Sequence, residues 1–381
     1  MVLLLCCLIP AGCGGDAPTP AASTAGGGFG AVERAADGQT VRWWMYGGDV
    51  AINRYVDRHV VPAAAARGVT LRRVPITDTA DAVNRVVAER RAGRDSGGAV
   101  DLIWINGENF AAGKEAGLWL EDWAGRLPNA RGLDLDAPIV AEDFRVPVDG
   151  QESPWSRAAF VFAYDRARVT DPPSDLDGLL AYARAHPGRV AYPAPPDFTG
   201  SAFVRQAVQR LGSERAGLDY LRRLKPFTYR KGRVQPKSEQ ELSTLFADGQ
   251  VDFAMSYDAS FVARGVRQGT FPETTRPFLI GGGSLQNTSY VVIPANAANR
   301  EGAQVVADVL LAPRLQALKA DPAVLGVPTV LEPDRLTARE RRLFRAAGSP
   351  YLLESLGTPL TELPADRVEP IEQAWTREVL R

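Results

Sequence analysis

A nearly continuous apolar run, Val100 to Ile105, constrains the fold of this chain more than any other feature. Only Asp101 interrupts it, and a strand that is apolar on both faces is typical of a parallel sheet covered by helices on both sides. Strands predicted at 41–46 and 69–76 precede this run, and a segment with helical character follows each of the three strands. This alternation of strands and helices predicts an α/β, doubly wound fold.

The chain has 381 residues, which is long enough for two domains. A second group of elements begins after Pro154 and contains predicted strands at 158–164, 189–192 and 251–257. A further strand, predicted at 288–293, can cross back to the first group, and the chain beyond it is mostly helical. We therefore expect a first lobe at 39–154, a second lobe at 155–284, and a crossover, a return to the first lobe and C-terminal helices at 285–381.

The front of the chain has the features of an export signal. Residues 1–13 form an apolar run with the length of a signal-peptide core, too short to span a bilayer as a helix. The run ends in Ala11-Gly12-Cys13, which is similar to a bacterial lipobox, where the Cys is lipidated and becomes the mature N-terminus. It departs from that pattern because Pro10 stands where Leu is usual and no Lys or Arg precedes the run.

The segment 14–38 follows this run and is rich in Gly, Ala, Pro, Ser and Thr up to Gly30, which indicates a flexible tether. We therefore expect an exported lipoprotein, held in the periplasm or at the cell surface through a lipid on Cys13. The alternative is an ordinary secreted protein with a cleaved leader. No later stretch approaches the length of a transmembrane helix.

Composition argues against several classes of protein. The 44 Lys and Arg nearly cancel the 45 Asp and Glu, which gives no support to a nucleic-acid partner. Only two His are present and all three Cys lie in the first 13 residues, so the sequence predicts no metal site. The sequence contains no G-x-S-x-G, no phosphate-binding loop, no H-E-x-x-H and no C-x-x-C. We therefore expect no catalytic residues and no cofactor.

Aromatic residues precede a glycine pair at the end of the first predicted strand. Trp43 and Tyr46 can stack on a ligand, and Gly47 allows a ligand to approach the backbone closely. The alternative is that Trp43 and Trp44 fill a core, and the alternation of side chains along a strand indicates that one of them does so.

Polar side chains follow the apolar run at 100–105. Asn106, Glu108 and Asn109 lie within four residues at a strand-to-helix turn. In doubly wound folds, ligands bind beyond the carboxyl ends of the strands, so we expect these three side chains to contact a ligand. The alternative is that Asn106 or Asn109 caps the following helix.

Asp197, Thr199 and Ser201 stand just before a helix predicted near Ala202. The free N–H groups of a helix N-terminus favour an anionic ligand, but Asp197 would repel one, and the alternative is capping alone. Carboxylates among aromatic residues suit a ligand with a positive end. Three further candidate contacts, for which the alternative is ordinary packing or hinge structure, are Trp155, Tyr257 and Asp258.

At this point the sequence resembles the extracellular solute-binding proteins of bacterial ABC importers, which have the type 2 periplasmic-binding-protein fold. The resemblance covers nearly the whole chain after about residue 39 and is most specific in VDLIWINGENF at 100–110, where it points to a branch described as thiamine-type. Weaker matches lie at 43–48, 77–83, 193–203 and 287–290.

The resemblance implies two α/β lobes, joined by crossing hinge strands, that close around one ligand. It implies a receptor that captures a small solute and presents it to an ABC permease. We expect the receptor to be a monomer, and the carboxylates and aromatic rings among the candidate residues suit a cationic or aromatic solute. Thiamine, a polyamine, another amine or a sugar would each suit the candidate residues. Two alternatives belong to other classes: a secreted two-lobe enzyme that uses Asp or Glu in acid-base chemistry, and a structural lipoprotein without transport function.

Overall fold

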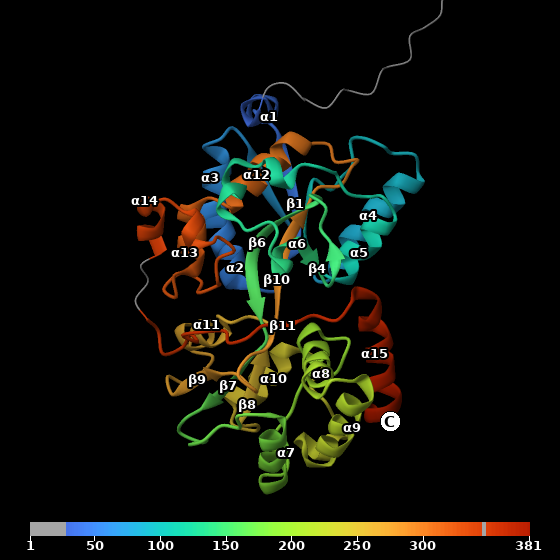
Figure 1. Cartoon of the computed structure of the whole chain (residues 1–381), viewed down its shortest axis with the longest axis vertical. Helices are drawn as coiled ribbons and strands as arrows, with labels where there is room; N and C mark the ends of the chain where they lie inside the picture. The colour runs from blue at the N-terminus through green and yellow to red at the C-terminus, as the bar shows by residue number, and fades with distance from the viewer. Residues whose placement is uncertain (1–27, 345–347) are drawn as a thin grey trace, which may run out of the picture.

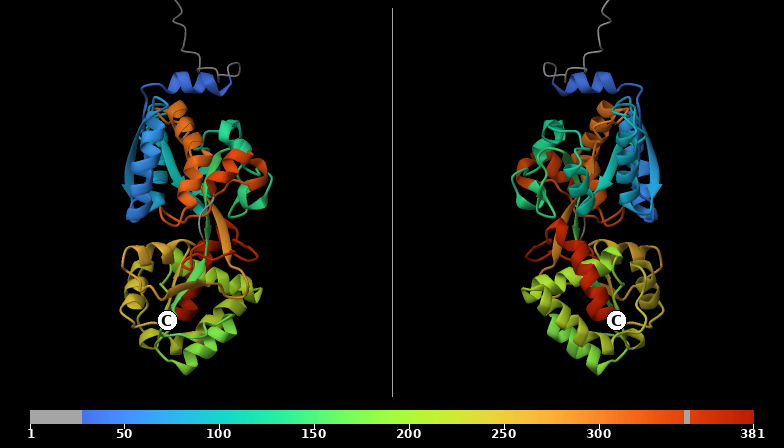
Figure 2. Two further views of the ribbon diagram at one scale, coloured as in Figure 1. Left: turned by 90° about the vertical axis from the view of Figure 1, so that its left-hand side faces the viewer. Right: turned by 90° about the vertical axis from the view of Figure 1, so that its right-hand side faces the viewer.

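The computed structural model describes residues 28–344 and 348–381, which form two α/β lobes joined by crossing strands (Figures 1 and 2). The predicted signal peptide, the predicted lipidation residue Cys13 and most of the predicted tether lie outside the described residues. The expected fold class, two α/β lobes with crossing strands, is confirmed. None of the described helices is long and apolar enough to cross a bilayer.

The sheet of the first lobe is mixed. β1 pairs in parallel with β2 on one side and with β3 on the other, and β10 lies antiparallel to β3. The strand order is β11-β10-β3-β1-β2, with β6 paired to β10. Its strands are β1 (Thr40–Tyr46), β2 (Thr70–Ile76), β3 (Leu102–Ile105), β6 (Glu152–Ala159), β10 (Leu285–Val292) and β11 (Leu360–Thr361).

Helices cover both faces of this sheet, which is why β3 is apolar on both sides. One face buries Trp43 and Met45, and the other buries Ile103 and Ile105. The helices of the lobe are α1 (Phe29–Ala36), α2 (Val50–Tyr55), α3 (Val61–Ala65), α4 (Thr79–Arg91), α5 (Glu108–Glu115), α6 (Pro138–Ala141), α12 (Arg300–Leu310), α13 (Pro313–Ala320) and α14 (Ala338–Arg341).

Two antiparallel strands connect the lobes. β6 runs out of the first lobe and continues, after Phe160, into β7 (Val161–Asp165) of the second. β10 returns beside β6, with pairing from Gln286↔Ala159 to Val292↔Glu152. The register shifts between Ser289 and Tyr290, which leaves Trp155 of β6 without a paired residue.

The backbone carbonyl of the unpaired Trp155 is satisfied by side chains from α13. Gln316 Nε2 donates to this oxygen at 2.9 Å, and Lys319 Nζ donates to it as well. Burial lowers the pKa of Lys319 well below its usual value. The irregularity in the crossing strands is therefore supported by a helix of the first lobe.

The second lobe has a three-stranded antiparallel sheet in the order β8-β7-β9, and so differs from the parallel arrangement of β1, β2 and β3. The prediction of a strand at 189–192 is wrong. Only Val190 forms a bridge, an isolated one to Thr228, and Pro193 follows the segment. The other strands of this sheet are β8 (Phe253–Ser256) and β9 (Thr275–Phe278), whereas the hairpin of β4 (Glu142–Asp143) and β5 (Val146–Pro147) lies in the first lobe. The helices of the second lobe are α7 (Leu176–Ala185), α8 (Phe198–Leu211), α9 (Glu214–Leu224), α10 (Glu239–Ala247), α11 (Phe261–Arg267) and α15 (Val368–Trp375).

The last helix, α15, packs on the second lobe (Figure 1). Ile371 and Trp375 are buried in the core of that lobe, and Trp375 Nε1 donates to Tyr192 Oη at 3.1 Å. Within residues 28–344 and 348–381, three parts of the chain link the lobes: β6–β7, β10, and residues 348–367, which lead through β11 (Leu360–Thr361) to α15. The apolar face of α15 accounts for the third link, because it completes the core of the second lobe.

The packing of α5 allows a test of this fold. A Cβ at Gly113 would overlap the indole ring of Trp119, so Gly113→Ala should destabilise the protein by about 1–3 kcal/mol in urea unfolding. The matched control is Gly30→Ala in α1, where the nearest atom to an added Cβ is 3.7 Å away. That change should be neutral or stabilising, because Ala favours helix more than Gly does. Equal effects of the two substitutions would contradict the packing of α5 against Trp119.

Candidate functional site

The carboxyl end of β1 meets the second lobe through an ion pair. Asp49 caps α2: its Oδ1 accepts from the backbone N–H groups of Ala51 and Ile52 at 2.8 and 2.9 Å. Its Oδ2 lies 3.0 Å from Arg264 Nη2 on α11, and Arg264 also pairs with Asp258. The carboxylates of both lobes therefore share one guanidinium.

Tyr46 ends β1 and is 48% exposed. Its ring lies over Gly48, where any side chain would collide with the phenol oxygen. Burial, followed by the charges of Glu239, Asp49 and Asp197, raises the pKa of Tyr46. Because two of these carboxylates belong to the second lobe, the Tyr46 phenol lies at the boundary between the lobes.

Two carboxylates of the second lobe lie on the other side of this boundary. Asp197 caps α8 through Gly200 N at 2.9 Å, and its other oxygen accepts from Glu239 N at 3.2 Å. Thr199 Oγ1 donates to Glu239 Oε2 at 2.5 Å. Burial raises the pKa of Asp197 and raises the pKa of Glu239 to about 7. The ring of Phe198, which stands between Asp197 and Thr199 in the sequence, is 40% exposed.

The turn after β3 forms a second polar region. Gly107, with a φ of +63°, caps α5, and its N–H donates to the buried Asp143 Oδ2 at 2.6 Å, so neither Asn106 nor Asn109 caps this helix. Asn106 and Asn109 are half-buried and Glu108 reaches solvent. Desolvation nevertheless raises the pKa of Glu108, with Arg205 opposing that shift.

Arg205 of α8 is the centre of a buried network. Its Nε lies 2.8 Å from Glu362 Oε2, and these side chains are only 1% and 2% exposed. Ser201 Oγ accepts from Arg205 Nη1 at 2.5 Å, and Tyr257 Oη donates to Glu362 Oε1 at 2.7 Å. Ser201 and Tyr257 are therefore engaged in this network and hold Arg205 and Glu362 in place.

The guanidinium of Arg205 also lies between aromatic rings of the two lobes. It is 5.5 Å from the ring centre of Phe144, near the end of β4, and 5.5 Å from that of Phe198 on α8. Arg145 Nε donates to Glu362 O at 3.0 Å on the same side of the boundary. This network is therefore a second point of contact between the lobes.

Two candidate aromatics lie elsewhere. Trp43 is 0% and Trp155 2% exposed, and their rings meet edge to face at 5.7 Å in the core of the first lobe. They present no ring surface to a ligand, because α2, α12 and α13 cover this face of the sheet. The alternative of core packing therefore describes their position. The other candidates lie at the ends of β1, β3 and β8 and at the start of α8: Tyr46, Gly47, Asn106, Glu108, Asn109, Asp197, Thr199, Ser201, Tyr257 and Asp258.

Sequence reasoning missed four charged residues at this boundary: Arg205, Glu239, Arg264 and Glu362. Ser238 caps α10, and a serine in this position is a signal from which Glu239 could have been placed at the start of a helix. Arg205 and Glu362 are 157 positions apart, and no local pattern connects them. Among the described residues, no group of three or more His, Cys, Asp or Glu could hold a metal ion.

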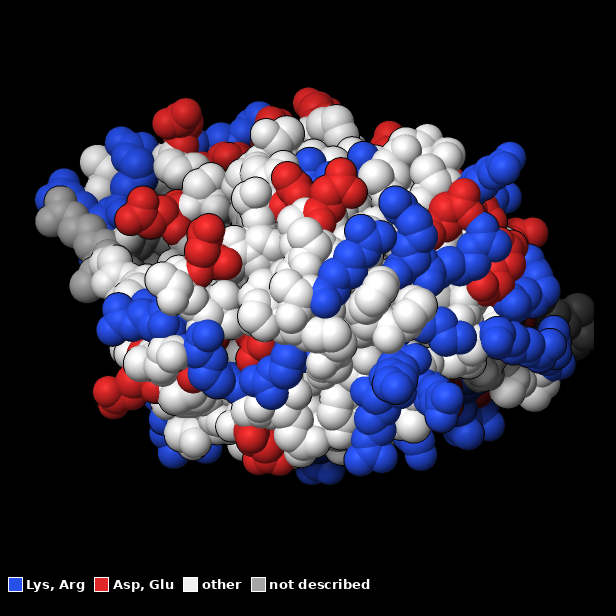
Figure 3. All heavy atoms as spheres, turned by 90° about the horizontal axis from the view of Figure 1, so that it is seen from below, with Lys and Arg blue, Asp and Glu red and all other residues white. Residues whose placement is uncertain are grey.

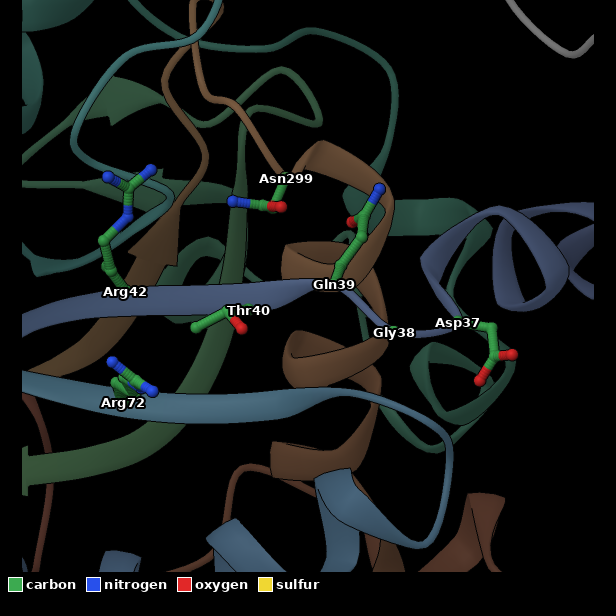
Figure 4. Close-up of a pocket in the computed structure, with 7 residues that line it drawn as sticks. All are labelled: Asp37, Gly38, Gln39, Thr40, Arg42, Arg72 and Asn299. Carbon is green, nitrogen blue, oxygen red and sulfur yellow. The ribbon is translucent and has the colours of Figure 1, made fainter.

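An open hollow of about 660 Å³ lies at the opposite end of β1 (Figure 4). Arg42, which lines it, pairs with Asp101 at 2.8 Å, and Asn299 Nδ2 donates to the same carboxylate at 3.1 Å. This hollow lies at the amino ends of β1 and β2, where doubly wound sheets do not usually bind ligands. Its lining residues are Asp37, Gly38, Gln39, Thr40, Arg42, Arg72 and Asn299.

The two lobes, the crossing strands and the polar loops that meet between them define a two-lobe binding protein. The chain belongs to the bacterial extracellular solute-binding protein family, whose model matches residues 60–332. It is 38% identical over 361 residues to Protein YnjB of Escherichia coli (strain K12), covering 90% of this chain and 92% of that protein. As the family implies, it is a solute-binding protein of the ABC-importer type.

Solved structures have the same fold at low identity. A periplasmic thiamin binding protein matches with a TM-score of 0.64 and 17% identity, covering 90% of this chain and 96% of that chain. The binding protein AfuA from Actinobacillus pleuropneumoniae, with fructose-6-phosphate bound, matches with a TM-score of 0.64 and 15% identity, covering 90% and 98%. The type 2 periplasmic-binding-protein fold expected from the resemblance is therefore confirmed.

The raised pKa of Glu239 makes the stability of the protein depend on pH. Because this pKa is about 7 in the folded protein and 4.5 is usual, the stabilisation that comes with protonation is present below about pH 4.5 and is lost as the pH rises through 7. The wild type should therefore lose stability relative to Glu239→Gln as the pH rises. The free energy of unfolding of Glu239→Gln, measured in urea, should increase by about 1–3 kcal/mol relative to that of the wild type between about pH 5 and about pH 8.

The companion variant is Thr199→Val. Thr199 donates to Glu239 and lowers its pKa, so removal of the hydroxyl should raise the pKa of Glu239 further. Carboxyl-carbon NMR titration of both proteins measures this directly. A difference between wild type and Glu239→Gln that stays constant across this pH range would contradict the burial of Glu239.

Proposed function

We propose that this chain is a membrane-tethered receptor that captures a small solute between its lobes by hinge closure and delivers it to an ABC permease. One observation carries the proposal: Asp49, three residues after the exposed Tyr46 of the first lobe, lies 3.0 Å from Arg264 of the second, and the charges of Asp197 and Glu239 help to raise the pKa of Tyr46. A solute held among these side chains would contact both lobes, and it would therefore stabilise the closed arrangement.

The charges at this point support a solute with a positively charged group. Within residues 28–344 and 348–381, neither Asp197 nor Glu239 makes an ion pair. The rings of Tyr46 and Phe198 are exposed nearby, and aromatic faces attract cations. Thiamine and other amines fit these requirements, whereas a neutral sugar would leave Asp197 without a counter-charge.

The other loop residues have supporting parts in the proposal. Asn106, Glu108 and Asn109 would orient the solute from the first lobe through amide and carboxylate groups, and the backbone at Gly47 would allow close approach. Asp258 would act by holding Arg264, and Thr199 by orienting Glu239. Ser201 and Tyr257 would act through the buried Arg205 network, and Trp43 and Trp155 only as packing beneath the site.

We further propose that the chain releases its solute unchanged and that a lipid on Cys13 holds it at the membrane. The family consists of binding proteins, which favours binding over the alternative of a secreted acid-base enzyme. Incubation of the purified protein with its solute should therefore yield no product. Lipidation is tested by mass spectrometry of the mature N-terminus, and a Cys13→Ser variant should lose the acylated species.

The solute can be identified by mass spectrometry of what co-purifies with the protein, with thiamine and spermidine as the first probes in calorimetry. Tyr46→Ala, Asp197→Asn and Glu239→Gln should each weaken binding at least about tenfold, since each removes a stacking or charged contact worth roughly 1.4 kcal/mol or more.

The matched control lies in the hollow at the other end of β1. Arg72→Gln also removes a charge, but Arg72 lies near the amino end of β2, whereas Tyr46 lies at the carboxyl end of β1. This variant should bind with the wild-type affinity. Loss of affinity in Arg72→Gln, with wild-type affinity in the three boundary variants, would move the site to the hollow and overturn the proposal.

Hinge closure is tested at Asp49. Asp49→Ser keeps a side chain that caps α2 but removes the charge that pairs with Arg264. The variant should unfold within about 1 kcal/mol of the wild type. It should nevertheless populate an open form more, which small-angle scattering and interlobe fluorescence transfer can measure.

Asp78→Ser is the control for this change. Asp78 caps α4 in the same lobe through Ala80 N at 2.9 Å, and it makes no ion pair with the rest of the described chain. The distribution of interlobe distances should not change in this variant. If Asp49→Ser also leaves it unchanged, the ion pair with Arg264 does not help to hold the lobes together.

A further inference from the structure

The second lobe carries a concentrated positive charge. Residues 214–237 contain eight Lys and Arg against two Asp and Glu, while the whole chain has a formal charge of −1. The segment consists of α9 and the short turns that follow it, and α9 lies at the end of the molecule opposite α1 (Figure 1). Lys and Arg side chains gather over much of the face seen from that end (Figure 3).

The two acidic residues of the segment do not neutralise it. Glu214 pairs with Arg367 from outside the segment at 2.7 Å, and Asp219 pairs with Arg222. Five other cations of the segment are exposed and make no ion pair within the described parts of the chain. We call these five residues the basic surface: Arg223, Arg230, Lys231, Arg233 and Lys237.

The backbone holds part of the basic surface in a defined shape. Arg230 and Lys231 have φ values of 49° and 60°, a left-handed conformation that costs free energy in residues other than glycine. The turn is attached to the body of the lobe, because Tyr229 N donates to Val190 O at 2.8 Å and Tyr229 Oη donates to Gln250 Oε1 at 2.8 Å. These charges are therefore presented on an anchored turn.

Exposed apolar side chains lie among these charges. Val234 follows Arg233 and is exposed. Leu211, also exposed, lines a hollow of about 630 Å³ together with Arg223. The exposed Leu380 at the end of the chain lies beside the segment, since Lys225 Nζ donates to its carbonyl at 2.8 Å. Cations with apolar side chains between them suit the headgroup region of a bilayer.

We propose that the basic surface docks the second lobe on a bilayer that contains anionic lipids. Arginine forms paired hydrogen bonds with phosphate oxygens, and clusters of four or more basic residues bind anionic membranes. A second copy of this chain is a poor occupant, because two such surfaces would repel each other. The exposed apolar residues favour a bilayer over an acidic protein surface. The proposal is independent of solute binding.

Vesicle co-sedimentation tests this docking. The full chain in a Cys13→Ser background, which excludes lipidation, is mixed with vesicles of phosphatidylcholine alone or of phosphatidylcholine with phosphatidylglycerol. Because every variant in this assay carries the same N-terminal segment, the difference in binding between the two kinds of vesicle measures the effect of lipid charge. Binding should require phosphatidylglycerol and should be lost in about 1 M salt, where screening acts within about 3 Å.

Two sets of substitutions with the same change in net charge locate the effect. Replacement of Arg223, Arg230, Lys231 and Arg233 by Gln should lower partitioning to phosphatidylglycerol vesicles roughly a hundredfold or more. The control set replaces exposed arginines of the first lobe that make no ion pair in the described chain. It should keep most of the binding, and its members are Arg58, Arg72, Arg91 and Arg126.

Three results would overturn the proposal. Equal binding to both kinds of vesicle would show that anionic lipid is not recognised. Equal losses in both sets of variants would show that net charge alone acts. Binding to poly-L-glutamate without binding to phosphatidylglycerol vesicles would assign the basic surface to an acidic protein partner instead. Both sets of variants should retain the unfolding midpoint of the wild type, because all eight side chains are exposed.

Discussion

The antiparallel pairing of β6 with β10 is the constraint on which the rest of the structure depends. It joins residues more than 120 positions apart, such as Ala159 and Gln286, and it sets the two lobes end to end. β1 and β3 end on the side of the first lobe that faces the second. The two loops that follow these strands therefore lie opposite the loop before α8 and the loop after β8. Without this pairing, the candidate residues would belong to two unrelated surfaces.

Charge then determines how the lobes meet. The ion pair between Arg205 and Glu362 is almost fully buried, and such a pair stabilises a fold only when other hydrogen bonds compensate for lost hydration. Ser201 and Tyr257 supply those bonds. The bridge from Asp49 to Arg264 is more accessible and less costly to break. The boundary therefore combines one contact built into the fold with one that can open in the proposed receptor.

The sequence predicted the loops of the candidate site better than the residues within them. Strand periodicity located the ends of β1, β3 and β8, so Tyr46, Asn106 and Asp258 were placed at the boundary. It could not decide whether Trp43 faces a ligand or a core, because a strand covered on both sides is apolar on both. The structure buries Trp43 and leaves Trp44 partly accessible.

The sequence by itself determined the α/β class, the positions of the strand ends and the resemblance to solute-binding proteins, because these depend on patterns within a few residues. Only the tertiary structure decided which polar groups face each other across the lobes and which are already paired inside the protein. Arg205 and Glu362 are 157 positions apart, and Asp49 and Arg264 are also distant in sequence. The partners of a charged side chain are set by the path of the chain between the lobes, and no local pattern contains that path.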